Sequence, residues 1–120
     1  MKRKAFVPLV AAGALVTATV AAAAVITGTP GDDVLRGTSH ADRISAFAGN
    51  DLVYARGGAD DVRAGAGNDG VRAGEGADVA YGGRGNDLVA GSDGNDRLYG
   101  GSDSDRVRFR SPSSYQTVTI

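Results

Sequence analysis

A nine-residue period runs without insertion or deletion from Gly28 to Arg108, and it constrains the fold more than any other feature. Cut at every ninth residue, this stretch gives the pieces GTPGDDVLR, GTSHADRIS, AFAGNDLVY, ARGGADDVR, AGAGNDGVR, AGEGADVAY, GGRGNDLVA, GSDGNDRLY and GGSDSDRVR. The sixth position is Asp in every piece, the eighth is always aliphatic, and the fourth is Gly in all but two. A short, strict period of this kind is typical of a solenoid, in which each repeat stacks on its neighbours.

The pieces resemble the RTX (repeats-in-toxin) nonapeptide family, whose motif is G-G-x-G-x-D-x-U-x. The segment Gly82–Ala90 matches this motif at every defined position. The resemblance implies an all-β fold, a parallel β-roll (β-solenoid) of nine nonapeptide repeats with two repeats in each coil. It also implies that calcium ions are held between stacked loops.

Each piece divides physically into a loop of six residues and a strand of three. Glycine supplies the positive φ angles that the loop needs, and Gly-Asn-Asp is turn chemistry. In the three-residue strand, side chains alternate outward, inward and outward, so only the eighth residue is buried. We therefore expect a thin core built from one aliphatic side chain per repeat.

Two repeats per coil would place each loop about 4.8 Å from the loop two repeats earlier. The sixth-position carboxylates then form one row on each edge, and carboxylates about 5 Å apart repel by roughly 3 kcal/mol at an effective dielectric of about 20. Ca²⁺ relieves this repulsion because it takes six to eight oxygen ligands from carboxylates and carbonyls, whereas Mg²⁺ demands stricter geometry. The predicted metal ligands are Asp33, Asp51, Asp69, Asp87 and Asp105 on one edge, and Asp42, Asp60, Asp78 and Asp96 on the other. The gaps between them number four and three, which predicts several calcium ions and at most about seven.

An 18-residue superperiod supports this two-edged arrangement. The fifth position of the odd repeats is polar throughout, whereas in three of the four even repeats it is Ala. We expect the two edges to differ in loop hydrogen bonding. The best sites are predicted between Asp51 and Asp69 and between Asp69 and Asp87. Weaker sites are expected beside His40 and Asp103, because each replaces the fourth-position glycine.

The N-terminal segment is typical of a secretory signal peptide over residues 1–24. Lys2, Arg3 and Lys4 precede an uncharged run, and Ala22 and Ala24 fit a cleavage pattern before Val25. The chain is therefore expected to be secreted and extracellular. The alternative is an uncleaved anchor that would hold an adhesive module with the same calcium-dependent fold at the cell surface, since the uncharged run is long enough to span a bilayer.

Composition excludes several functions for residues 25–108, the expected roll, and 109–120, a C-terminal cap or tail. Without Cys there is no disulfide scaffold or thiol enzyme. Beyond residue 24 the chain has ten basic and 14 acidic residues and no Lys, so no nucleic-acid partner is expected. A single His and the lack of room for a catalytic domain predict that the chain is not an enzyme. No membrane contact is expected after cleavage, and a protein or carbohydrate partner stays unidentified.

Outward-facing strand positions carry the large polar side chains. Tyr54, Tyr81 and Tyr99 occupy the ninth position, where they are either ordinary strand residues or a contact patch for carbohydrate or protein. Arginines at the same position are expected to balance the aspartate charge; these are Arg36, Arg63, Arg72 and Arg108.

Overall fold

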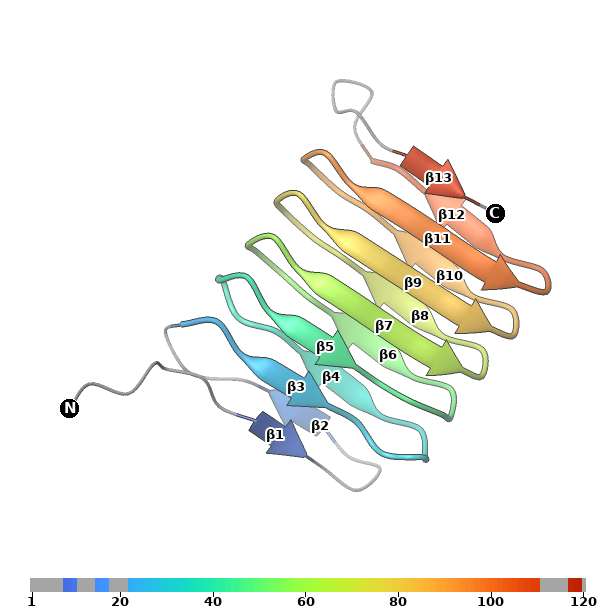
Figure 1. Cartoon of the computed structure of the whole chain (residues 1–120), viewed down its shortest axis with the longest axis horizontal. Coiled ribbons are helices and arrows are strands. Elements are labelled where there is room, and N and C mark those ends of the chain that lie inside the picture. The colour runs from blue at the N-terminus through green and yellow to red at the C-terminus, as the bar shows by residue number, and fades with distance from the viewer. Residues whose placement is uncertain (1–7, 11–14, 18–21, 111–116, 120) are drawn as a thin grey trace.

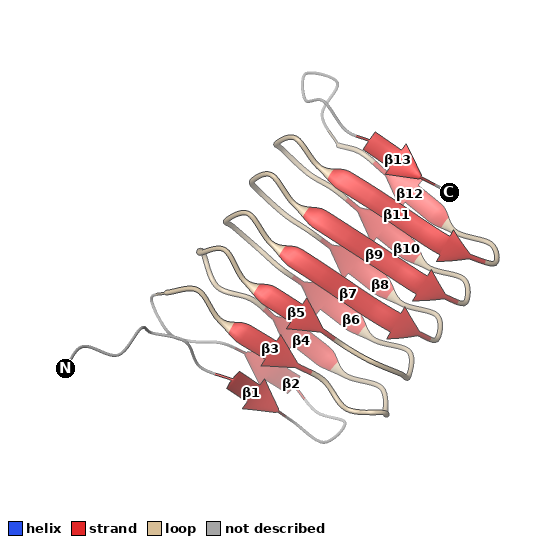
Figure 2. Cartoon of the chain, viewed as in Figure 1, coloured by secondary structure: helices blue, strands red, loops and turns tan. Residues whose placement is uncertain are grey.

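The computed structural model describes residues 8–10, 15–17, 22–110 and 117–119, and every regular element among them is a β-strand. Successive strands alternate between two parallel sheets that lie face to face (Figure 1, Figure 2). The seven-stranded sheet has the spatial order β1 (Pro8–Val10), β3 (Val25–Thr27), β5 (Arg43–Ser45), β7 (Asp61–Ala66), β9 (Val79–Arg84), β11 (Arg97–Ser102) and β13 (Thr117–Thr119). The six-stranded sheet has the order β12 (Arg106–Arg108), β10 (Leu88–Ala90), β8 (Gly70–Arg72), β6 (Leu52–Tyr54), β4 (Val34–Arg36) and β2 (Leu15–Thr17). The predicted all-β parallel solenoid is confirmed.

The pairing register shows that one coil contains two nonapeptides. Ile26 pairs with Ile44, Ile44 with Val62, and Val62 with Ala80, each partner lying 18 residues further along the chain. The same offset joins the strands of the other sheet, for example Val53 to Val71. Equivalent positions of alternate repeats therefore stack in straight columns along the solenoid.

The core consists of the predicted column of eighth-position side chains together with a second column that the sequence analysis did not expect. Both columns are at most 1% exposed: Leu35, Ile44, Val53, Val62, Val71, Ala80, Val89 and Leu98 at the eighth position, and Ala46, Ala55, Ala64 and Ala73 at the first. The first position is Gly or Ala in every repeat, so this second column consists of small side chains only. So thin an apolar core contributes less than an ordinary domain core of this length.

Strands of one sheet are longer than predicted. β7, β9 and β11 contain six residues each, whereas the strands of the other sheet keep the expected three. The extra length continues into the next repeat, where Gly65 pairs with Gly83 and Gly83 with Gly101. Glycine at these second positions lets neighbouring backbones approach closely enough for the ladder to continue.

The glycine at the fourth position has a steric reason as well as a conformational one. Gly67 has φ 126°, and a Cβ atom added there would collide with the carbonyl oxygen of Gly49 one coil earlier. Any other residue would push adjacent loops apart. This close approach fixes the vertical spacing of the loops and therefore of the aspartates.

The two ends of the chain add strands to the roll. β1 and β2 fall within the predicted signal peptide and pair with β3 and β4 in the uncleaved chain, so cleavage after Ala24 stays a prediction. β13 pairs with β11 at the C-terminal end, whereas Phe109 is 46% exposed, and the capping role of residues 109–120 also stays a prediction. Within the described ranges, no helix has the length and apolar character needed to span a membrane.

Candidate metal centre

The sixth-position aspartates form two continuous rows, one on each edge of the roll. Each aspartate except the last of each row donates its backbone N–H to the carboxylate Oδ1 of the aspartate 18 residues later, at 2.8–3.0 Å. One row runs Asp33, Asp51, Asp69, Asp87, Asp105, and the other runs Asp42, Asp60, Asp78, Asp96. The predicted stacking is present. The N–H bridge between coils was not foreseen, because the sequence pattern says nothing about side-chain direction.

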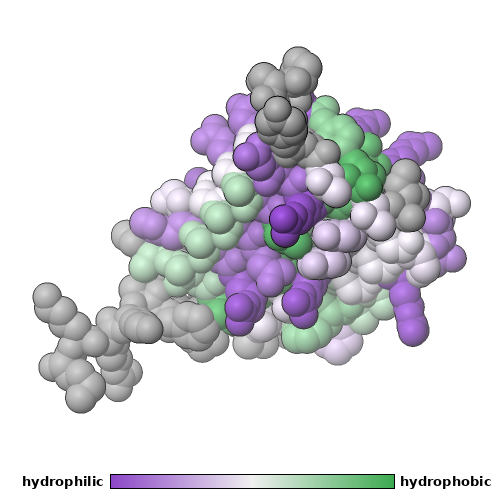
Figure 3. Space-filling model, turned by 45° about the horizontal axis from the view of Figure 1, so that its top comes forward, coloured by the Kyte–Doolittle hydropathy of each residue, from purple (hydrophilic) through white to green (hydrophobic). Residues whose placement is uncertain are grey.

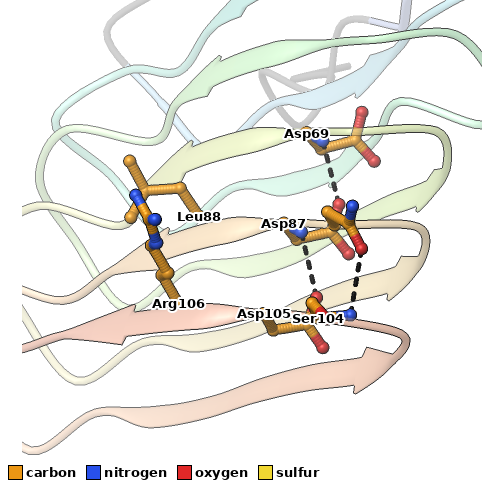
Figure 4. Close-up of a pocket in the computed structure, with 7 residues that line it drawn as sticks. Asp69, Asp87, Leu88, Ser104, Asp105 and Arg106 are labelled. Carbon is orange, nitrogen blue, oxygen red and sulfur yellow. Dashed lines mark hydrogen bonds between the residues drawn. The ribbon is translucent and has the colours of Figure 1, made fainter.

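Figure 4 shows one row at its C-terminal end, where Asp69, Asp87 and Asp105 lie above one another. A cavity of about 380 Å³ lies against these residues and is also lined by Leu88 and Arg106. The opposite edge has a similar cavity of about 490 Å³ beside Asp78 and Asp96. Both edges therefore offer space next to the carboxylate rows.

These carboxylates are buried although the loops that carry them lie at the surface. Apart from Asp105, which is half-buried, every sixth-position aspartate is at most 3% exposed. Burying an ionised carboxylate without compensation is costly. Each of these groups must therefore bind a proton, a hydrogen-bond donor or a cation.

From the third repeat onward, one carboxylate oxygen of each aspartate lacks a partner. The second oxygen, Oδ2, is buried and accepts no hydrogen bond in Asp51, Asp60, Asp69, Asp78, Asp87 and Asp105. Asp96 is intermediate: burial raises its pKa and its Oδ2 has no hydrogen bond, but the nearby backbone N–H of Ser92 opposes the rise. A row of buried, unpartnered carboxylate oxygens is the arrangement expected of cation ligands rather than of surface charge.

Burial is the main cause of strongly shifted pKa values along both rows. It raises the pKa of Asp60 to about 8 and that of Asp78 to about 7. The pKa values of Asp51 and Asp87 rise to about 6. The N–H donated by the preceding coil lowers each value in opposition, while carboxylates on neighbouring coils raise it further. At neutral pH without a cation, Asp60 and Asp78 therefore retain much of their protonated form, and ionising any of the four groups costs the folded roll stability.

In the last three repeats the first position is glycine and lies directly against the unpartnered oxygen. A Cβ atom built on Gly82 would lie 2.6 Å from Oδ2 of Asp87, and one built on Gly100 would lie 2.6 Å from Oδ2 of Asp105. Glycine thus leaves Oδ2 facing bare backbone. Across the described residues, no group of three or more His, Cys, Asp or Glu side chains gathers at one point. Any metal ion here would take its remaining ligands from backbone carbonyls, which suits the hard, oxygen-seeking Ca²⁺.

Loop hydrogen bonding differs between the two edges, as the superperiod predicted. On the edge formed by the odd-numbered repeats (the odd edge, which carries Asp33 and Asp105), each fifth-position side chain accepts a backbone N–H from a neighbouring coil, so that the bonds form a ladder. Asn50 N–H donates to Asp32 Oδ1 at 2.7 Å, and Asn68 N–H donates to Asn50 Oδ1 at 2.8 Å. The ladder continues through Asn86 to Ser104 at 2.9 and 3.0 Å. Alanines at the same position of the even edge cannot form such a ladder.

The two repeats that lack the fourth-position glycine behave differently from each other. Asp103 takes the left-handed conformation with φ 79° and accepts the N–H of Gly85 at 3.0 Å. His40 is exposed and donates its backbone N–H to Thr38 Oγ1 at 3.0 Å. Asp103 therefore preserves the loop conformation at the cost of backbone strain.

Arginines do not pair with the aspartate rows. All ten arginines between residues 22 and 110 are exposed, and the ion pair found among the described residues joins Arg63 to Asp61 at 3.7 Å. Arg36 and Arg72 instead lie over the Tyr54 ring, at 5.5 and 5.9 Å from its centroid. The expectation that ninth-position arginines balance aspartate charge is met at Arg63, which pairs with Asp61, while among the described residues no ion pair reaches a sixth-position aspartate.

The ninth-position tyrosines do point outward. Tyr81 and Tyr99 stack with ring centroids 4.6 Å apart, and Arg63 covers the Tyr81 ring at 5.8 Å. The faces of the Tyr81 ring are thus occupied within the protein. Hydrophilic and hydrophobic residues are interspersed on the face shown in Figure 3.

A family profile described as the RTX calcium-binding nonapeptide repeat (4 copies) matches residues 23–46, 37–71 and 72–107. These matches cover most of the chain. They include the first eight nonapeptides in full and the sixth-position aspartate of the ninth. No curated protein and no solved structure matches the chain.

Proposed function

The chain belongs to the RTX calcium-binding nonapeptide repeat family, and we propose that it is a secreted structural protein that folds outside the cell when calcium binds between its stacked loops. The observation that carries this proposal is the row of buried, unpartnered Oδ2 atoms on each edge. Calcium bound there would satisfy these oxygens and neutralise the rows. The side chains that would hold it are the sixth-position aspartates, with backbone carbonyls of the same loops.

The energetic argument links binding to folding. The apolar core is thin, and the carboxylates disfavour the empty roll at neutral pH. A ligand that binds only the folded state stabilises it by about 1.4 kcal/mol per site at tenfold excess over Kd. Several such sites would supply the stability that the core lacks. Extracellular modules bind calcium at about 10⁻⁴–10⁻³ M, which favours folding after export.

Calcium binding is tested by isothermal titration of the purified chain with Ca²⁺ and, separately, with Mg²⁺. Asp69→Asn keeps the Oδ1 acceptor that Asp51 uses but replaces Oδ2 by an amide nitrogen, so we expect fewer bound ions and weaker binding. Asp93→Asn is the matched control, because Asp93 is an exposed carboxylate outside both rows. Equal calcium binding by the two variants would contradict a role for the rows.

Export is tested by sequencing the N-terminus of the protein recovered from the culture medium. We expect Val25 or a close neighbour as the first residue, in keeping with the predicted cleavage pattern. Intact Met1 in the membrane fraction would instead establish the anchored surface module.

A further inference from the structure

The first two repeats satisfy their aspartates without any metal. Asp33 Oδ2 accepts the backbone N–H of Thr29 at 2.6 Å, and the Thr29 hydroxyl lies 3.0 Å from both oxygens of the same carboxylate. Thr38 repeats this contact with Asp42, donating its N–H at 2.6 Å, with its hydroxyl at 2.8 and 3.0 Å. Neither carboxylate has an unpartnered oxygen.

The backbone conformation of the loops separates the first two repeats from the next five as well. At the second position of the next five repeats the backbone is left-handed, including two residues that are not glycine, Phe47 with φ 77° and Arg56 with φ 79°. Thr29 and Thr38 occupy the equivalent position and are not among the residues with positive φ. In the threonine loops the N–H turns toward the carboxylate, where it meets Oδ2.

From these two observations we infer that Thr29 and Thr38 decide which carboxylates bind calcium, because their N–H and hydroxyl groups occupy the place of the ion. This inference rests on the proposed calcium binding and narrows it. The first two repeats form a metal-free cap, and the gaps that involve Asp33 and Asp42 hold no ion. Two of the seven predicted gaps are thereby removed, and five remain between aspartates with unpartnered oxygens; among these, the gap between Asp78 and Asp96 differs because the N–H of Ser92 lies near Asp96.

The position of the cap at the start of the mature chain explains why its aspartates need donors from their own loops. Residues 28–45 form the first coil after the predicted cleavage site, so cleavage would leave Asp33 with no earlier coil to donate to it. Thr29 supplies these donors from within the same loop. The capped coil therefore offers a ready template on which later, calcium-dependent coils stack.

The test is the number of calcium ions bound per chain at saturation, measured by equilibrium dialysis and accompanied by circular dichroism. Asp42→Asn is expected to leave the calcium number unchanged, whereas the matched variant Asp60→Asn is expected to lose about one ion. Wild-type protein that binds no calcium would refute the proposed function itself. Calcium-binding protein that loses ions equally in the two variants would overturn the cap.

A gain-of-binding variant guards against the case in which Asp42→Asn fails to fold. Thr38→Gly removes the hydroxyl and permits the left-handed conformation seen in later loops, so we expect about one additional ion per chain. Thr38→Ser keeps both donors and is expected to bind the wild-type number. An unchanged calcium number in folded Thr38→Gly protein would overturn the inference.

Discussion

Residues 28–45 and residues 46–108 have the same nonapeptide period, the same two-repeat coil and the same sixth-position aspartates, but the buried carboxylates have different hydrogen-bond partners in the two regions. In the first region a threonine donates to both oxygens. In the second, Oδ1 is held by the preceding coil and Oδ2 has no hydrogen bond. The comparison shows that the sixth-position carboxylate has different partners in the two regions. On the inference drawn above, threonine at the second position of the loop is what closes the first two carboxylates to calcium.

Acid should replace calcium in the second region, and this is the largest effect we expect. The folded-state pKa values of Asp60, Asp78, Asp51 and Asp87 lie above the unfolded value of 3.8, so protonation stabilises the empty roll. This stability is fully present below about pH 4 and is lost as the pH rises through about 6 to 8. Circular dichroism in excess chelator should therefore show β-structure at acid pH and its loss by pH 8.

A flat signal in chelator over the whole pH range would contradict this linkage. The variant with Asp60→Asn and Asp78→Asn removes the two carboxyls whose pKa values rise to about 8 and about 7. We expect its unfolding in chelator to move toward higher pH.

Substitution within the two regions should shift the calcium midpoint of folding unequally. Asp69→Ala removes a carboxylate that borders two gaps, and we expect a roughly tenfold higher midpoint. Asp33→Ala removes a carboxylate held by Thr29 and should change the midpoint much less. Equal midpoint shifts in a fluorescence- or dichroism-detected titration would mean that the two regions do not differ.

The second loop position should respond with opposite sign in the two regions. Thr29→Val deletes the hydroxyl that bonds a buried carboxylate but keeps the N–H on Oδ2, so no ion gains access and the free energy of unfolding should fall by about 1–2 kcal/mol. Phe47→Gly relieves a left-handed φ of 77° at an exposed side chain, which should raise it by up to about 1 kcal/mol. Urea unfolding at saturating calcium measures both, and destabilisation by Phe47→Gly would show that its ring makes compensating contacts.

The odd-edge ladder should contribute the smallest effect. Asn68→Ala removes the Oδ1 that accepts the N–H of Asn86 at 2.9 Å. Because both groups are exposed, water replaces much of the bond and the expected loss is about 0.5–1 kcal/mol. Urea unfolding measures this loss, and Asn68→Asp serves as the control because it retains the acceptor. An identical loss in both variants would assign the effect to charge or packing rather than to the ladder.

Much of the fold could be predicted because the period fixes the register. The in-phase aspartates and aliphatic residues predicted the two sheets, and the alternation of Asn50 and Asn68 with Ala59 and Ala77 predicted unequal edges. The direction of the carboxylates could not be predicted, since it depends on backbone N–H groups one coil away. The role of Thr29 and Thr38 was also missed, although hydroxyl residues replacing the second glycine of the motif were visible in the sequence.

A calcium titration of the purified protein at neutral pH, followed by far-ultraviolet circular dichroism, tests the central claim most directly. The unpartnered, buried carboxylates of residues 46–108 predict a disordered spectrum in chelator that converts to β-structure as calcium is added. Because each coil templates the next, the transition should be cooperative, with a Hill coefficient above about 1. A β-roll spectrum that persists at neutral pH in excess chelator would contradict the account.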